Sequence, residues 1–547
     1  GTRKAICFSD MKYKNKSKCP LPVLSLKKVD NGHEDIIIQL KGKFTNMTLK
    51  NNATYRLYER YVDFNTDKVL KVLEKIDGEQ ENSLFLNILK DPKEFSLSGK
   101  RQHPKELNDI LEQCDKFSMS QSQKKIAQEL LKKRLQIVWG PPGSGKTHFL
   151  ALFVTWYLTS VISRETNFII GITACTNDAI DNLLHRISYL LESHKKESDF
   201  SCCRVGELEE PKNDKPNRVV LGGTVWDWYK KIREKYRCDI MIIDEGSQLL
   251  ASDACVVMEV LDPDDGKLII AGDHMQLGPI IHNAYPIFQD KHPLIFGSIQ
   301  QCLMRKEDGT SFNGDFFLNE KGSERDYGPY TLQLNDNWRM NKELNSFFQE
   351  IYGDNYESKD TNLKLDFDLS KIKDQEIEKI FRSKAAITLV KLILNNHENS
   401  GLVEADVVAK IVSVYFDAIQ PPKNCNDKPS LIVVTPQHSQ RRAIQSKVKN
   451  YLENSEFNLK IGTVDKMQGQ QADLVIACFG FHDVNEITRK SSFLFDPNRW
   501  NVAISRIEIL SKKKTSEGLA YISKLEAWAQ EKEKREKNSA IIELKMD

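Results

Sequence analysis

The feature that most constrains the fold is a glycine-rich loop set between an apolar strand and an apolar helix. Residues 135–139 read LQIVW, a short run that predicts a buried strand. Residues 140–147 read GPPGSGKT, and the apolar run that follows predicts a helix over residues 146–162. A glycine-rich loop in this context is typical of a P-loop, whose backbone amides turn inward around phosphate groups.

The loop predicts a nucleotide phosphate site, because the start of a helix adds positive potential to the inward-facing amides. Lys146 is expected to neutralise the β- and γ-phosphates, and the hydroxyl of Thr147 is expected to ligate Mg²⁺. A glycine-rich turn without a ligand is the alternative, and the flanking strand and helix argue against it. The predicted nucleotide-binding residues of the loop are Gly140, Pro141, Pro142, Gly143, Ser144, Gly145, Lys146 and Thr147.

Two further apolar runs lead directly into polar residues. Residues 240–243 (IMII) precede Asp244 and Glu245. Ligands bind at the carboxyl ends of parallel strands, so Asp244 is expected to hold Mg²⁺ and Glu245 to polarise the attacking water. A simple acidic loop would fit the same residues, but the P-loop upstream favours the catalytic interpretation. Residues 267–271 precede Asp273 and Gln276, which could sense the γ-phosphate or belong to an ordinary turn.

A chain of 547 residues is too long for one ordinary core, and its patterns change along its length. Near the N-terminus, residues 35–40 and 55–64 are rich in β-branched and aromatic residues and predict strands. Further on, apolar strands alternate with helices, which predicts parallel sheets covered by helices; the other expected strands are 168–173, 430–434 and 473–479. The predicted divisions are 1–103 (β-rich accessory domain and linker), 104–330 and 331–510 (two α/β domains) and 511–547 (helical tail).

Composition narrows the class of protein only slightly. The net charge is +2, so a nucleic-acid partner would need a local basic groove. Eleven cysteines at irregular spacing favour reduced thiols in an intracellular compartment, cytoplasmic or nuclear, and no zinc knuckle. The longest apolar run, residues 149–162, is too short to span a bilayer, so no membrane partner is expected. A chain that opens with Gly1 rather than Met is compatible with a piece of a larger protein, which would bring further domains or partners.

Polar motifs recur in a particular order along the chain. They are SQ at 122–123, ACTNDAIDNL at 174–183, GT at 223–224, GDHMQLGP at 272–279, LNDNWRM at 334–340, VTPQHSQR at 434–441, TVDKMQGQQAD at 463–473 and NRWNVAISR at 498–506. Over about residues 117–506 this order resembles the superfamily-1B helicases, in particular the nonsense-mediated-decay RNA helicase group. The resemblance implies two tandem RecA-like parallel-sheet domains, a small N-terminal β-rich accessory domain, and 5′-to-3′ movement.

The resemblance also implies roles around the nucleotide. Gln123 would read the adenine, and Arg339 and Arg506 would act as arginine fingers. Two positions depart from the family pattern: Trp338 replaces a tyrosine and keeps a stacking face, and Gln471 replaces a glutamate and loses a charge. The expected catalytic residues are Lys146, Asp244, Glu245, Gln276, Arg339 and Arg506.

A second set of motif residues is expected to grip a single strand through its phosphates, which carry no base information. Helix capping or strand packing is the alternative role of the threonines in this set. The expected strand contacts are Thr176, Asn177, Thr224, Thr435, Gln440, Arg441 and Thr463.

The sequence therefore predicts a nucleic-acid-stimulated ATPase and helicase that uses ATP and Mg²⁺ and translocates on single-stranded RNA or DNA by closing its two domains around the nucleotide. An ATP-dependent switch or scaffold that binds strands without unwinding is the alternative, and the loss of charge at Gln471 leaves room for it. A P-loop kinase of a small acceptor fits less well, because such a kinase needs no second α/β domain with arginine motifs.

Overall fold

A computed structural model gives the fold, and the chain divides by its contacts into two compact units, Gly1–Glu74 and Lys75–Asp547. Within the described residues, no helix combines the length and the apolar character that crossing a membrane requires. The structure describes residues 5–10, 21–30, 34–40, 55–60, 66–78, 83–98, 113–161, 167–193, 200–207, 218–233, 236–279, 297–312, 327–359, 365–383, 385–394, 400–420, 428–454, 456–467, 470, 472–478, 480, 498–499, 501, 527–531 and 541–546.

The first unit holds a four-stranded antiparallel sheet in the order β3-β2-β1-β4. The strands predicted at residues 35–40 and 55–64 are confirmed as β3 and as a shorter β4. The β-rich interpretation of residues 1–100 is wrong from Thr66 onward, where the described residues are helical. The bounds are β1 Ala5–Asp10, β2 Leu21–Asp30, β3 Glu34–Leu40, β4 Tyr55–Arg60, α1 Thr66–Gly78, α2 Leu84–Lys90 and α3 Pro92–Leu97.

Helices α2 and α3 are tied to the α/β part of the second unit. The hydroxyl of Ser83, which caps α2, donates to Glu259 Oε1 at 2.8 Å, and the Ser96 hydroxyl donates to the carbonyl of Leu135 at 2.9 Å. Arg305 Nη2 donates to the carbonyl of Leu89 at 2.8 Å. The last of these bonds satisfies a carbonyl in the final turn of α2 that has no partner within the helix.

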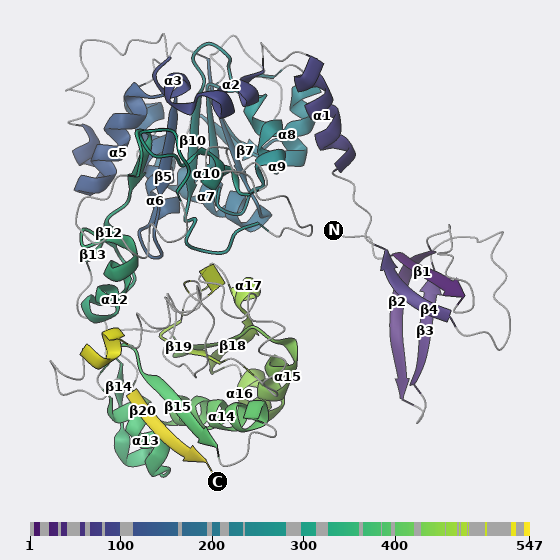
Figure 1. Cartoon of the computed structure of the whole chain (residues 1–547), viewed down its shortest axis with the longest axis vertical. Helices are drawn as coiled ribbons and strands as arrows, with labels where there is room; N and C mark the ends of the chain where they lie inside the picture. The colour runs from purple at the N-terminus through teal and green to yellow at the C-terminus, as the bar shows by residue number, and fades with distance from the viewer. Residues whose placement is uncertain are drawn as a thin grey trace. The chain divides into compact units, whose positions relative to one another are not determined.

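The second unit is built on a seven-stranded parallel sheet in the order β11-β5-β10-β9-β6-β8-β7 (Figure 1). The strands predicted at 135–139, 168–173, 240–243 and 267–271 are confirmed within a residue at each end. Their bounds are β5 Leu135–Trp139, β6 Phe168–Ala174, β7 Ser201–Arg204, β8 Arg218–Gly222, β9 Ile240–Asp244, β10 Lys267–Gly272 and β11 Thr331–Gln333. Every residue of β5, β8, β9 and β10 is buried, as expected of a sheet covered on both faces.

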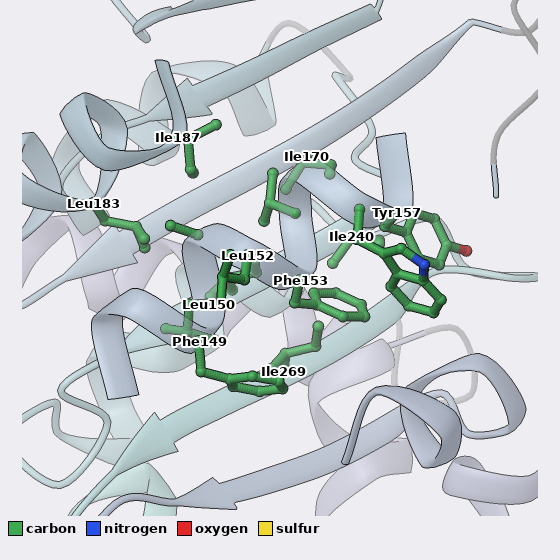
Figure 2. Packing of buried hydrophobic residues seen from close by; sticks show 14 of the residues in the cluster. Phe149, Leu150, Leu152, Phe153, Tyr157, Ile170, Leu183, Ile187, Ile240 and Ile269 are labelled. Carbon is green, nitrogen blue, oxygen red and sulfur yellow. The ribbon is translucent and has the colours of Figure 1, made fainter. Parts of the chain in front are cut away.

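Helix α6 (Lys146–Trp156) fills the centre of this core. Its side chains Phe149 and Phe153 are fully buried and pack with Ile240 and Ile269 of the sheet (Figure 2). The α-helix ends earlier than predicted, because residues Tyr157–Val161 wind into a π-helical turn. The other helical segments of this region are η2 Gln113–Phe117, α5 Gln121–Lys132, α7 Asn177–Ser193, α8 Val225–Arg233, α9 Ala251–Met258 and α10 Ile299–Leu303.

Later in the chain, smaller parallel sheets and their helices enclose a second core. Strands β18-β17-β19 pair in parallel, and β15 pairs in parallel with β20. The strands predicted at 430–434 and 473–479 are confirmed as β17 and as a shorter β19. The bounds are β12 Asp336–Asn337, α12 Lys342–Tyr352, β13 Glu357–Ser358, β14 Asp366–Phe367, η5 Leu369–Lys371, α13 Gln375–Arg382, β15 Leu389–Leu394, α14 Ser400–Ala418, β16 Ile419–Gln420, β17 Ser430–Thr435, α15 His438–Lys447, α16 Lys449–Glu453, β18 Asn458–Thr463, α17 Val464–Met467, β19 Leu474–Ala477 and β20 Ile541–Met546.

Strand β20 corrects the prediction of a helical tail over residues 511–547. The segment reads IIELKM and places Ile542 and Leu544 in the core while Glu543 is exposed. That alternation has the period of a strand, and the charged residues upstream had masked it. Within the predicted tail, residues 527–531 are helical, and residues 532–540 lie outside the described residues.

The burial of β20 makes a prediction about stability. Leu544→Ala removes a side chain that is 1% exposed, so it should lower the free energy of unfolding by about 2–5 kcal/mol. Glu543→Gln, at the exposed neighbouring position, is the matched control and should change it by less than about 0.5 kcal/mol. Urea denaturation followed by fluorescence measures both. Equal, small effects would mean that β20 does not contribute to the core.

Candidate nucleotide-binding site

The glycines of residues 140–147 have backbone geometry that other residues would strain. Gly143 has φ +87° and Gly145 has φ +72°, both in the left-handed region. A Cβ on Gly140 would lie 2.9 Å from Lys146 Cβ, closer than side chains tolerate. The Ser144 Oγ is buried and has no hydrogen-bond partner among the described residues. The tight loop and the buried Ser144 hydroxyl, which is available to donate a hydrogen bond, fit the phosphate groups that the sequence predicts.

Four predicted residues meet beside this loop. Lys146 Nζ lies 2.8 Å from Glu245 Oε1 and 3.7 Å from Asp244 Oδ1. The hydroxyl of Thr147 donates to Asp244 Oδ2 at 3.3 Å. The sequence patterns at 140–147 and 240–245 therefore converge on one place, at the carboxyl end of β9.

The charges of this cluster perturb one another. Burial alone would lower the pKa of Lys146, but Glu245 and Asp244 raise it above its usual value. Burial raises the pKa of Asp244, and the Lys146 ammonium opposes that shift. Among the described residues no group of three or more His, Cys, Asp or Glu side chains could hold a metal by itself. One carboxylate and one hydroxyl suit Mg²⁺, which usually takes few protein ligands and completes its shell with water and phosphate oxygens.

Glu245 has φ +53°, which is unusual for a residue with a side chain. Its backbone N–H donates to Asp244 Oδ1 at 2.8 Å, and Gln248 N donates to the Glu245 carbonyl at 2.8 Å. These bonds hold a sharp turn straight after β9 and keep the carboxylate against Lys146. Backbone outliers of this kind collect at functional sites, where the surrounding structure holds them in place.

The polar side chains of the loop after β10 bond to groups within the protein. Asp273 is buried, and its carboxylate accepts hydrogen bonds from Trp139 Nε1 (2.8 Å), Tyr352 OH (2.8 Å) and Gln276 Nε2 (2.9 Å). Burial raises the pKa of Asp273, and those hydrogen bonds oppose that shift. The Asp273 carboxylate therefore accepts its hydrogen bonds from groups of the protein and is not presented to a phosphate. It also holds the side chain of Gln276 in place.

The segment before α12 lies against the phosphate loop. Trp338 N donates to the Gly143 carbonyl at 2.9 Å, and a Cβ on Gly143 would lie 2.8 Å from Arg339 Cβ. The Trp338 side chain is 54% exposed, so an aromatic face is open beside the loop. Asn337 Oδ1 accepts from the backbone of Arg339 at 2.9 Å and fixes this turn. Burial lowers the pKa of Arg339.

Gln123 occupies the start of α5, where it forms a capping box with Ser120. Its Oε1 accepts from Ser120 N at 3.0 Å, and the side chain is buried. The hydroxyls of Ser120 and Ser122 donate to Asp336 Oδ2, the second at 2.6 Å. Burial would raise the pKa of Asp336, but these hydroxyls and Lys359 hold it below its usual value. The segment of Gln123 is thus bonded to the turn that carries Trp338 and Arg339.

The predicted strand contacts on the first sheet lie at helix starts. The exposed Thr176 accepts from Ala179 N at 3.2 Å through its hydroxyl, and the Thr224 hydroxyl donates to Asp227 Oδ2 at 2.8 Å. Asn177 is exposed and accepts from Arg204 Nη2 at 3.1 Å. The Thr176 hydroxyl therefore caps α7, which is the alternative role expected for the threonines, whereas the Thr224 hydroxyl bonds to a carboxylate in the first turn of α8. Both threonines follow the carboxyl ends of strands.

Three of the four later strand contacts are buried, and Arg441 is the exception. Thr435 and Gln440 are fully buried, and Gln440 Nε2 donates to the Gly401 carbonyl at 2.8 Å, so their side chains are not presented to a ligand. Thr463 is 6% exposed, and Arg441 is partly exposed with its Nε lacking a partner among the described residues. Gln471 and Arg506 lie outside the described residues.

Several residues of the site had no sequence signal that singled them out. Trp139 reads as one more apolar strand residue, and Tyr352 and Tyr356 read as core aromatics of a helix and its end. Asn501 Nδ2 donates to the Met275 carbonyl at 2.8 Å, a contact between residues far apart in the chain. Position directly before the glycine loop is the signal that could have found Trp139, and Asn501 lies inside the motif at 498–506.

Comparison with known proteins supplies the family. Two family models, both described as an AAA domain, match residues 118–237 and 322–509. The DNA polymerase alpha-associated DNA helicase A of Schizosaccharomyces pombe is 23% identical over 512 residues, covering 78% of this chain and 67% of the relative. The DNA replication ATP-dependent helicase/nuclease JHS1 of Arabidopsis thaliana is 24% identical over 412 residues, covering 70% of this chain and 27% of the relative.

Another relative and a solved structure are also similar to this chain. The regulator of nonsense transcripts 1 homolog of Neurospora crassa is 22% identical over 444 residues, covering 71% of this chain and 36% of the relative. Among solved structures, Saccharomyces cerevisiae Dbp5 bound to RNA and ADP BeF3 aligns with a TM-score of 0.36 at 12% identity, covering 79% of this chain and 95% of that one. The helicase motifs, the two matched domains and the relatives agree: the chain belongs to the superfamily-1B helicases and is an ATP-hydrolysing enzyme of that family.

Proposed function

We propose that this enzyme moves along single-stranded nucleic acid in the 5′-to-3′ direction and unwinds duplexes as it hydrolyses ATP. The observation that carries the proposal is the cluster of Lys146, Thr147, Asp244 and Glu245 beside a glycine loop built for phosphate. The relatives' printed names, a DNA helicase, a DNA replication helicase/nuclease and a regulator of nonsense transcripts, support nucleic acid as the polymer.

The cluster supports a route for hydrolysis. Lys146 now pairs with Glu245 at 2.8 Å, and a γ-phosphate entering the loop would draw the ammonium toward itself. Glu245 would then be free to accept a proton from the attacking water. Thr147 and Asp244 would hold Mg²⁺, which neutralises charge on the phosphate oxygens when bound. Arg339, which lies beside Gly143, would stabilise charge as it develops on the transferring phosphoryl group.

ATP hydrolysis would also have to be coupled to movement along the strand. We assign Arg506 as a second finger, Gln471 as a nucleotide contact and Gln276 as a group that responds to the γ-phosphate. Nucleotide binding would close the two sheet domains, taken as 104–330 and 331–510 with β20 added to the second. Trp338 would stack on the base, and the amide of Gln123 would contact the adenine from its capped position.

The strand itself would be held at helix starts and strand ends. Thr176, Thr224 and Thr463 would contact phosphates through hydroxyls and nearby backbone amides, and Asn177 would do so through its side-chain amide. Arg441 would supply positive charge. Thr435 and Gln440 are 0% exposed, whereas Thr463 is 6% exposed, so the first two residues would position the other groups and not touch the strand. Such contacts carry little base information, so both RNA and DNA strands of any sequence are candidate substrates. We propose that the enzyme acts inside the cell.

A polymer-dependent ATPase assay tests the proposed function. ATP turnover should rise strongly with single-stranded RNA, single-stranded DNA or both. Lys146→Ala should lower turnover by on the order of 10²–10³-fold, because the loop loses its phosphate cation. Lys132→Ala, an exposed lysine on α5, is the control and should behave as wild type. Turnover indifferent to both polymers would favour a switch or a small-molecule kinase over a motor.

Glu245→Gln tests the general base. The change keeps the size of the side chain and removes its ability to take a proton, so turnover should fall by about 10²–10⁴-fold. ATP should still bind and remain intact in the complex, which filter binding with labelled ATP measures. Normal turnover in this variant would contradict the assigned role.

Salt dependence tests the strand interface. For single strands the slope of log affinity against log salt is about −0.7 for each phosphate neutralised, so Arg441→Ala should make the slope shallower by about 0.7. Arg382→Ala is the control, because that exposed arginine pairs with Glu378 and is not assigned to the interface. Fluorescence anisotropy with a labelled strand measures both slopes. Identical slopes for wild type and Arg441→Ala would remove Arg441 from the contact set.

A further inference from the structure

Tyr352 links two segments that are distant in sequence. It is the last residue of α12 and is 1% exposed. Its hydroxyl donates to Asp273 Oδ2 at 2.8 Å and accepts a hydrogen bond from Asn501 Nδ2. Asp273 follows β10 of the seven-stranded sheet, and Asn501 belongs to the motif that also contains Arg506. One hydroxyl therefore joins these two motifs directly.

The carboxylate that Tyr352 contacts is also bound to the start of the phosphate loop. Trp139, the residue before Gly140, donates its Nε1 to Asp273 Oδ1 at 2.8 Å. The Gly140 backbone N–H donates to the Gly272 carbonyl at 3.0 Å. A buried carboxylate tolerates little displacement of its donors, because each lost hydrogen bond leaves charge unsatisfied. Movement of the phosphate loop would therefore be felt at Asp273.

Helix α12 reaches the phosphate loop by a second route. Asn345 accepts from Asn337 Nδ2 at 2.7 Å and donates to the Tyr356 carbonyl at 2.7 Å, while the Tyr356 hydroxyl donates to the Pro142 carbonyl. The helix is therefore fixed to the loop near its N-terminal half, and its C-terminal residue carries the link to Asn501. This is the geometry of a short rigid connector between a nucleotide site and a second segment.

We propose that Tyr352 is a positioning residue through which the phosphate loop and the 498–506 motif respond to each other, so that strand binding accelerates ATP hydrolysis. The inference rests on the proposed function, since it concerns stimulation by the strand. Its hydroxyl takes no part in the chemistry and passes displacement between Asp273 and Asn501. The competing role is packing alone, because the Tyr352 ring also contacts Trp139, Phe348 and Tyr356.

Tyr352→Phe separates these roles, since it keeps the ring and removes the hydroxyl. The measured quantity is the stimulation ratio, kcat with saturating single strand divided by kcat without it, together with KM for ATP. The ratio should fall by about 10-fold, within the range typical of coupled sites. KM for ATP should change by less than about 2-fold, because the ATP contacts stay in place.

Tyr415→Phe is the matched control. Its hydroxyl is likewise directed to a protein acceptor, the Ser430 carbonyl at 3.1 Å, and its ring is fully buried far from the phosphate loop in sequence. This variant should keep the wild-type ratio. An unchanged ratio in Tyr352→Phe, or an equal fall of both rates that leaves the ratio intact, would overturn the proposal. Wild-type turnover that ignores the strand would instead overturn the proposed function.

A second variant covers loss of folding. If Tyr352→Phe melts well below wild type, Asn501→Ser breaks the same link from the other end and is measured in the same way. Where both variants fold, the double variant gives a further test. If the two residues form one link, the double variant should have a stimulation ratio no lower than the lower of the two single-variant ratios. Multiplicative losses would show that the two residues act separately and would contradict the proposal.

Discussion

The parallel register of β5, β10 and β9 is the constraint on which the site depends. It pairs Trp139 with Gly272 and Ile243 with Ile270, so the three strands end at one level. The residues that follow each strand then meet at one edge: the phosphate loop after β5, Asp273 after β10 and Asp244 with Glu245 after β9. Backbone bonds from Gly140 to Gly272 and from Gly246 to Ala271 lock the three turns together at 3.0 Å and 2.8 Å.

This edge concentrates charge in a place where water is scarce. The side chains of Lys146, Asp244 and Asp273 are largely shielded from water. Partner groups stabilise the charge or satisfy the acceptor oxygens of each one. Removing one partner from such a set costs more than the interaction itself stabilises, because the remaining charge stays buried. The set is therefore poised to respond to an added polyanion, and the connected aromatic residues spread that response beyond the loop.

Local patterns predicted the elements whose signal is local. The strand at 135–139, the glycine loop and the acids at 244 and 245 were readable because apolar runs and glycines adjoin the functional groups. Two partners of Asp273 were not, since Trp139 and Tyr352 come from distant segments and each has an ordinary core appearance. The burial of Thr435 and Gln440 could not be predicted from the sequence either. Both residues lie in a motif that suggests contact with a ligand, but tertiary packing encloses them.

The pairing of β15 with β20 has a consequence for how the chain is made. The two strands are separated by roughly 150 residues, yet they share a full parallel register from Leu389↔Ile541 to Leu394↔Met546. During synthesis β15 emerges long before its neighbour and must wait with unpaired backbone groups along one side. An unpaired strand edge invites pairing with other chains, and distant parallel pairings form slowly. Proteins that shield nascent chains would therefore have to protect this strand until β20 has been made.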